Sequence, residues 1–129
     1  MRAERLLSQH SLANGLTLEF WDLSRPVLGD RWQVVVEARL AIPVNADNLP
    51  LELKDQASRV TAVLGAEMVF TKQEGRYFIP MAKVEDTVRT IEAALVASLS
   101  RYLGHPEFPV KFLRNKWRAI QENSPGGRS

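Results

Sequence analysis

The stretch RWQVVVEARLAI, from Arg31 to Ile42, decides the fold class. Apolar side chains stand at every second position, and the positions between them hold mostly polar residues. A period of two residues over this length predicts a β-strand with one buried face, because successive side chains point to opposite faces. The apolar face comprises Trp32, Val34, Val36, Ala38, Leu40 and Ile42, with Gln33, Glu37 and Arg39 on the other face. Pro43 ends the pattern.

A first hairpin is predicted upstream of this strand. Asn14-Gly15 favours a two-residue turn with positive φ at both positions, and residues 16–21 that follow it alternate between apolar and polar. With this turn His10 falls opposite Glu19. Residues 2–9 are either the other strand of the hairpin or a short helix.

A second hairpin is predicted between residues 68 and 79. Its strands would be residues 68–71 and 76–79. Gln73-Glu74-Gly75 would form a three-residue loop with glycine at the left-handed position. This register pairs Phe70 with Phe78.

Apolar residues spaced by three and four predict helices at about 52–64, 83–103 and 109–121. Ile91 and Leu95 lie in the middle of the longest stripe and should be buried. Hairpins followed by a long helix predict an α+β fold, a two-layer sandwich. Its antiparallel sheet, made of two hairpins or a meander, is backed by the long helix of the C-terminal half. Residues 1–122 would form one domain, with a disordered tail at 123–129.

Composition excludes several kinds of chemistry. The 129 residues include no cysteine and only His10 and His105, so a conventional zinc site lacks ligands. The sequence contains neither GxxxxGK[ST] nor GxGxxG, the glycine-rich motifs that cradle phosphates. We therefore expect no cofactor and no metal. The sequence shows no secretory leader and no apolar run long enough to span a membrane, which together with the absence of cysteine suggests the cytoplasm.

Catalytic constellations are equally sparse. His10 beside Glu19 is better explained as a surface cross-strand pair, and His105 as a residue that helps to end the long helix. Leu12-Ala13-Asn14-Gly15-Leu16-Thr17-Leu18 resembles the first hairpin of pitrilysin-type zinc peptidases. The HxxEH metal motif of those enzymes is absent, so the resemblance implies no activity here.

Basic residues gather near the C-terminus. Lys111, Arg114 and Arg118, which we name the basic stripe, recur at helical spacing beside Trp117. Such a helix is typical either of a solvated surface or of a contact with phosphate or an acidic partner. Trp21 is a second candidate contact, since it points away from the apolar face of its strand.

The leading hypothesis is a non-catalytic protein-binding, adaptor or self-associating module. One alternative is a nucleic-acid-binding domain that uses the basic C-terminal helix. The other is an enzyme of an unfamiliar type that works from carboxylates or from His10.

Overall fold

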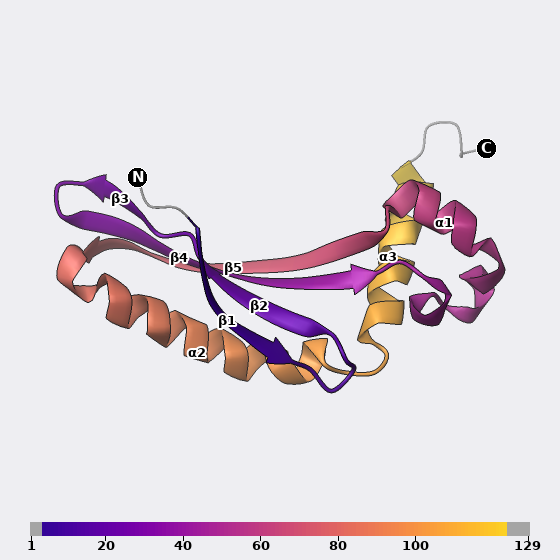
Figure 1. Cartoon of the computed structure of the whole chain (residues 1–129). Helices are drawn as coiled ribbons and strands as arrows, with labels where there is room; N and C mark the ends of the chain where they lie inside the picture. Colours follow the sequence, from indigo (N-terminus) through magenta and orange to yellow (C-terminus); the bar gives the residue numbers. More distant parts are fainter. Residues whose placement is uncertain (1–3, 124–129) are drawn as a thin grey trace. The chain divides into compact units, whose positions relative to one another are not determined.

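The computed structural model describes residues 4–123, with Asn123 described only in its backbone. In this part of the chain a five-stranded antiparallel sheet packs against helices, which confirms the predicted α+β fold (Figure 1). The chain forms two compact units: Met1–Leu40 with Phe70–Gly104, and Ala41–Val69 with His105–Ser129. The prediction of a single domain over residues 1–122 stays a prediction.

The sheet is organised around one long central strand, with which three other strands pair. Strand β2 (Thr17–Asp22) and strand β3 (Arg25–Leu28) follow one another along the same edge of β4 (Arg31–Pro43). Strand β1 (Arg5–Ser11) pairs with β2. Strand β5 (Glu67–Pro80) also pairs with β4. It must use the other edge of β4, because a strand has only two edges.

The first hairpin turns near the predicted place but in a different register. Leu12 N donates to the Leu16 carbonyl at 2.8 Å, which leaves a three-residue loop closed by Gly15 at φ +88°. Asn14 keeps a negative φ, so the predicted two-residue turn does not form. The register therefore shifts by one residue and places His10 opposite Leu18 instead of Glu19. A one-residue shift moves a side chain to the other face of the sheet.

The upstream arm of this hairpin is the strand β1, so the alternative of a short helix before residue 10 is wrong. An irregularity between Leu6 and Ser8 interrupts its pairing with β2. The pairing of β2 with β4 is regular through Trp21.

The second predicted hairpin is wrong, because residues 67–80 form one continuous strand. Gly75 does not turn the chain. A Cβ atom built on it would lie 3.0 Å from the Val34 carbonyl oxygen. A glycine within a strand often marks such a close approach of two backbones. Phe70 and Phe78 consequently lie on the same strand and do not pair with each other.

The long helix α2 (Val84–Leu103) follows a short 3-10 turn, η3 (Met81–Lys83), and covers the apolar face of the sheet in its own unit. Ile91 and Leu95 are each only 3% exposed, as predicted. The same unit contains side chains of β2 and β4 that are fully inaccessible. These are Leu18, Phe20, Val34, Val36, Ala38 and Leu40.

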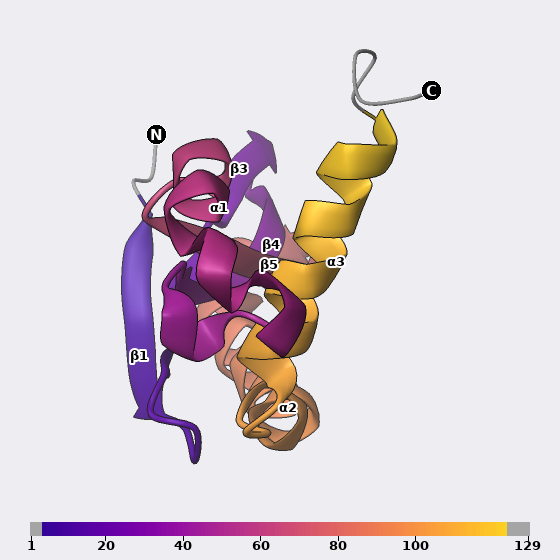
Figure 2. The ribbon, with the colours of Figure 1, turned by 90° about the vertical axis from the view of Figure 1, so that its right-hand side faces the viewer.

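The other unit contains η1 (Ala46–Asn48), η2 (Leu51–Gln56), α1 (Ala57–Leu64) and α3 (Phe108–Asn123), which Figure 2 shows from the side. The helix predicted over 52–64 is thus a 3-10 segment followed by a short α-helix. Asn123 belongs to α3, whereas the rest of the predicted tail, residues 124–129, lies outside the described residues. Over residues 4–123, no helix combines the length and the apolarity needed to cross a membrane.

Candidate protein-binding site

One edge of strand β5 is free among the residues that the structure describes. There β5 pairs with β4 alone, and no described helix or loop makes a backbone hydrogen bond to residues 71–80 from the other side. A free edge presents a row of unpaired N–H and C=O groups, which is a template for another strand. Most of β5 from Thr71 to Phe78 is exposed.

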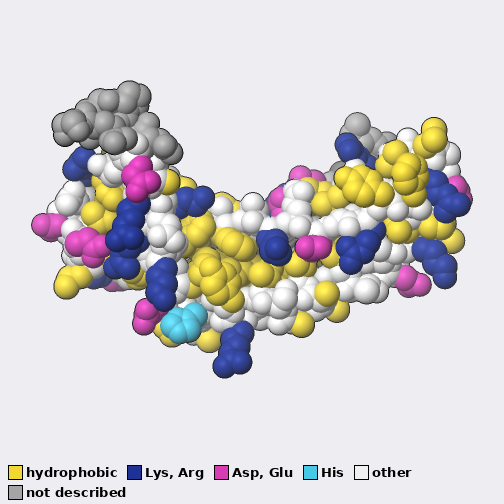
Figure 3. Space-filling model, turned by 180° about the vertical axis from the view of Figure 1, so that it is seen from behind, with side chains coloured by type: hydrophobic (Ala, Val, Ile, Leu, Met, Phe, Trp, Pro, Cys, Tyr) yellow, Lys and Arg dark blue, Asp and Glu magenta, His cyan; other side chains and the backbone are white. Residues whose placement is uncertain are grey.

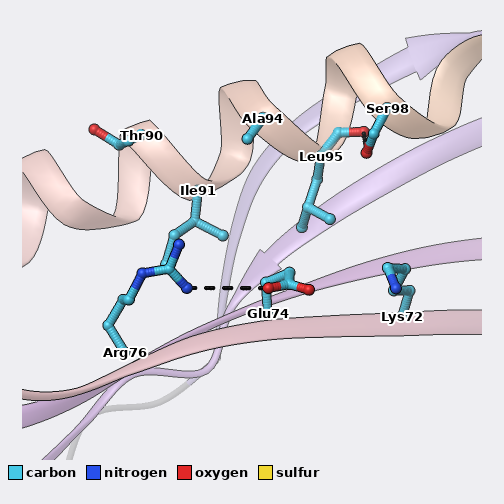
Figure 4. A pocket seen from close by; sticks show the side chains of 8 residues that line it. All are labelled: Lys72, Glu74, Arg76, Thr90, Ile91, Ala94, Leu95 and Ser98. Atoms are coloured by element: carbon cyan, nitrogen blue, oxygen red, sulfur yellow. Dashed lines mark hydrogen bonds and ion pairs between the residues drawn. The ribbon is translucent and has the colours of Figure 1, made fainter.

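A groove runs beside this edge, between β5 and α2. It has a volume of about 250 Å³. Figure 4 shows Lys72, Glu74 and Arg76 on the strand, and Ile91 and Leu95 pointing toward them from the helix. The other side chains that the helix adds to the lining are small, namely Thr90, Ala94 and Ser98. Small side chains on the helix therefore keep the space beside the strand open.

The charges on the groove side of β5 alternate in sign. Lys72, Glu74 and Arg76 stand at every second position and share one side of the strand. Arg76 Nη1 lies 3.9 Å from Glu74 Oε2, a loose ion pair between exposed side chains. Lys72 makes no ion pair with any residue that the structure describes. Charged side chains of both signs and hydrophobic side chains share the face shown in Figure 3.

The opposite side of β5 joins a polar cluster on the outer face of the sheet. Gln73 Nε2 donates to Glu37 Oε2 at 2.8 Å, and Arg39 Nε donates to Glu37 Oε1. Burial acts to raise the pKa of Glu37, but the hydrogen bonds from Gln73 and Arg39 outweigh it and hold that pKa below its ordinary value. The Arg39 guanidinium lies 4.8 Å from the centre of the Trp21 ring. This cluster fixes the middle of β5 to β4 and leaves its other edge free.

Exposed apolar side chains gather at the end of β5. Tyr77 is 70% exposed, and Phe78 and Met81 are each 62% exposed. Met81 N donates to the Asp30 carbonyl at 2.8 Å, which places this end beside the turn that carries the exposed Leu28. Phe78 has φ +56°, a conformation that bulky residues rarely adopt and that ends the regular part of the strand.

The structure does not present the predicted C-terminal site as one exposed surface. Trp117 is only 7% exposed, and the Arg59 guanidinium lies 5.5 Å from the centre of its ring. Arg114 Nε donates to Glu52 Oε2 at 3.1 Å. The Glu52 pKa is lowered first by a hydrogen bond from its own backbone and then by Arg114. Trp117 is therefore buried and does not lie accessible beside the basic stripe.

Lys111 and Arg118 remain exposed, and Lys111 Nζ lies 3.7 Å from Glu107 Oε1. The two stripe residues are thus available on the surface of α3. A contact of the basic stripe with phosphate or an acidic partner stays a prediction.

Trp21 also differs from the expected picture of an exposed contact. It is half-buried, its indole Nε1 donates to Glu19 Oε1 at 3.0 Å, and Arg39 covers its ring. Trp21 lies on the outer face of the sheet, as its place in the strand predicts.

His10 faces α2 and approaches Phe20 edge to face at 5.6 Å. Its Nε2 lies 3.1 Å from Ser8 Oγ, and Ser8 Oγ donates to Glu92 Oε2 at 2.5 Å. A nucleophilic serine needs a base that is itself oriented by a third group. Here the serine lies between the imidazole and the carboxylate, so the arrangement joins β1 to α2 and does not form a relay.

The sequence does not predict this groove, because Gln73-Glu74-Gly75 is predicted to form a loop. The alternation of Lys72, Glu74 and Arg76 was visible in the sequence and is the pattern that could have indicated a strand. Among the described residues, no group of three or more His, Asp or Glu side chains could hold a metal ion. No family model, no curated protein and no solved structure matches this chain.

Proposed function

We propose that the chain is a protein-binding module that accepts an extended segment as an additional strand on the free edge of β5. The single observation that carries the proposal is that this free edge lies along an open groove. Strand addition of this kind gains affinity from main-chain hydrogen bonds and specificity from alternate side chains. The groove supplies the place where those alternate side chains would lie.

The groove selects its ligand by charge more than by apolar burial. Ile91 and Leu95 form its floor but are already 97% covered, so an incoming side chain gains little apolar area there. Lys72, Glu74 and Arg76 form its accessible wall. Inward-pointing charges on an edge strand disfavour pairing with arbitrary strands. They permit pairing with a strand whose charges match.

The dimensions agree with this proposal. Pockets for small molecules typically have volumes of about 300–1,000 Å³ and are more enclosed. The groove, at about 250 Å³, is smaller and lies open along the strand. An extended peptide uses such a space better than a compact small molecule, because it also pairs with the strand edge. The absence of cysteine suits a reducing compartment, and we propose the cytoplasm.

The test is to pan a displayed library of random linear peptides against the full chain and against a variant with a filled groove. Ala94→Trp fills the groove from an exposed helix position, and Ala93→Trp places the same bulk at an exposed position outside the lining. Peptides enriched on the wild-type chain should bind Ala94→Trp at least about tenfold more weakly and Ala93→Trp within about twofold. Hydrogen exchange should show new protection of β5 amides when such a peptide binds.

Enriched peptides that bind Ala94→Trp as well as they bind the wild-type chain would contradict the proposal. So would protection that leaves β5 unchanged and falls on another element.

A further inference from the structure

The order of charges on β5 is self-complementary. On the groove side the strand presents a cation, an anion and a cation at residues 72, 74 and 76. When a strand pairs antiparallel with a copy of itself, a two-fold axis passes through one residue, and residues equally far on either side of it face each other. The sign pattern therefore decides which axis is favourable.

Three axes can be compared. An axis at Glu74 places the two Glu74 carboxylates opposite each other and Lys72 opposite Arg76, so like charges meet throughout. An axis at Gln73 places Lys72 of each copy opposite Glu74 of the other, which gives two opposite-charge pairs. An axis at Gly75 places Glu74 opposite Arg76, again as two opposite-charge pairs. Directly opposed unlike charges stabilise a strand pair, and like charges destabilise it.

Backbone geometry distinguishes the two favourable axes. An axis at Gln73 needs only residues 71–75 for its two charge pairs, all within the regular part of β5. An axis at Gly75 brings Phe78, with its φ of +56°, into the ladder opposite Lys72. The axis at Gln73 also leaves the loose contact between Arg76 and Glu74 in place, while Lys72, which makes no ion pair among the described residues, gains one.

We propose that the strand accepted at this edge is β5 of a second copy of the chain, paired antiparallel about Gln73 with Lys72 of each copy opposite Glu74 of the other. This inference rests on the proposed function, because it names the partner of the same site. The two sheets would join into one continuous antiparallel sheet across the two-fold axis. Neither copy would then keep a free β5 edge.

The test reverses the charges one at a time and then together. Sedimentation equilibrium of the full chain between about 1 µM and about 1 mM should show a reversible dimer for the wild-type chain. Lys72→Glu and Glu74→Lys should each weaken the dimer by about tenfold or more, because two attractive pairs become two repulsive ones. The double variant should recover the wild-type dimerisation constant to within about threefold.

Mixing provides the sharpest readout. In a mixture of Lys72→Glu with Glu74→Lys, one chain presents two anions and the other two cations at the paired positions. The mixture should form a heterodimer at concentrations where each variant alone is monomeric. Lys83→Glu, which makes the same charge change at an exposed position outside β5, should leave the dimer unchanged. Circular dichroism of each variant is the control that tests whether it is folded.

The outcomes separate the inference from the function on which it rests. If the wild-type chain is monomeric but still binds displayed peptides, and Ala94→Trp weakens that binding, the inference that the partner is a second copy would be overturned. The proposed function would stand. A dimer that ignores Lys72→Glu would overturn the inference, because another surface would then hold it. Rescue of Glu74→Lys by Arg76→Glu instead of Lys72→Glu would overturn the axis at Gln73. A monomer that also binds no peptide would overturn both proposals.

Discussion

Arg5 offers the most direct test of how the sheet is joined to its covering helix. Its Nη2 donates to Asp22 Oδ2 at 3.0 Å and to Glu85 Oε1 at 2.9 Å. Asp22 is the last residue of β2, and its side chain is 0% exposed. It also accepts a hydrogen bond from Ser24 N at 2.9 Å. One guanidinium thus links β1, β2 and the first turn of α2. We would replace it by Arg5→Met, which keeps an apolar stem of similar length.

The structure sets bounds on how much Arg5→Met lowers the free energy of unfolding. Removing one partner of a fully buried ion pair costs about 3–5 kcal/mol, because the remaining charge stays buried. Arg5 is 41% exposed in its side chain, so water can reach Asp22 in the variant and lowers the cost. Arg5 Nε is buried and has no hydrogen-bond partner among the described residues, so its removal recovers about 1 kcal/mol. We expect the free energy of unfolding to fall by about 1–3 kcal/mol.

Urea unfolding at neutral pH, followed by circular dichroism and by tryptophan fluorescence, measures this change. Glu85→Gln is the matched control, because it removes a contact between side chains that are 41% and 54% exposed. Exposed pairs of this kind contribute about 0–1 kcal/mol. If Arg5→Met costs no more than Glu85→Gln, the guanidinium does not compensate the buried carboxylate and the reasoning is refuted.

Three further changes have defined expectations. Leu95→Ala should lower the free energy of unfolding by about 2–5 kcal/mol, measured by urea unfolding, since it deletes a side chain that is 3% exposed. Glu37→Gln should lower stability at neutral pH, and its difference from the wild-type chain in thermal melts should shrink as the pH falls from about 5 to about 3. The sign follows because a carboxylate with a lowered pKa stabilises the fold above its unfolded pKa and loses that contribution as it is protonated. Asp55→Asn, an exposed carboxylate, is the control for that series and should shift the melts little. Reversing all three charges of the basic stripe should not change the retention of random RNA or DNA in a gel shift, because we expect no retention at moderate salt even before the change.

The sequence predicts the elements that bury one regular face. The strand predicted from Arg31 to Ile42 is β4, and the helix predicted from Lys83 to Leu103 is α2, which begins one residue later. In both, the apolar period equals the structural period, because each element presents a single face to the core. That local rule requires no knowledge of the partner element. It explains why Ile91 and Leu95 could be expected in the core before any topology was known.

The hairpin register could not be predicted in the same way. Asn14-Gly15 is compatible with a two-residue loop, and also with a three-residue loop in which only Gly15 has a positive φ. The side chain of Asn14 also donates to the Leu103 carbonyl at 2.8 Å, a contact from the far end of α2 that no local pattern reports. Tertiary contacts therefore help to settle the loop, and the loop then decides that His10 faces the core.

Gly75 shows why the candidate site could not be predicted from the sequence. A glycine between two short apolar runs predicts a turn when only its neighbours in sequence are considered. In the structure it serves the close approach of β5 to Val34, which only the packing of two strands distant in sequence reveals. The same correction changes the meaning of Lys72, Glu74 and Arg76. In a loop these charges would be an ordinary solvated tip, whereas on a continuous edge strand their alternation places all three along one groove. The three charges form a site only because the strand that carries them is unbroken from Glu67 to Pro80.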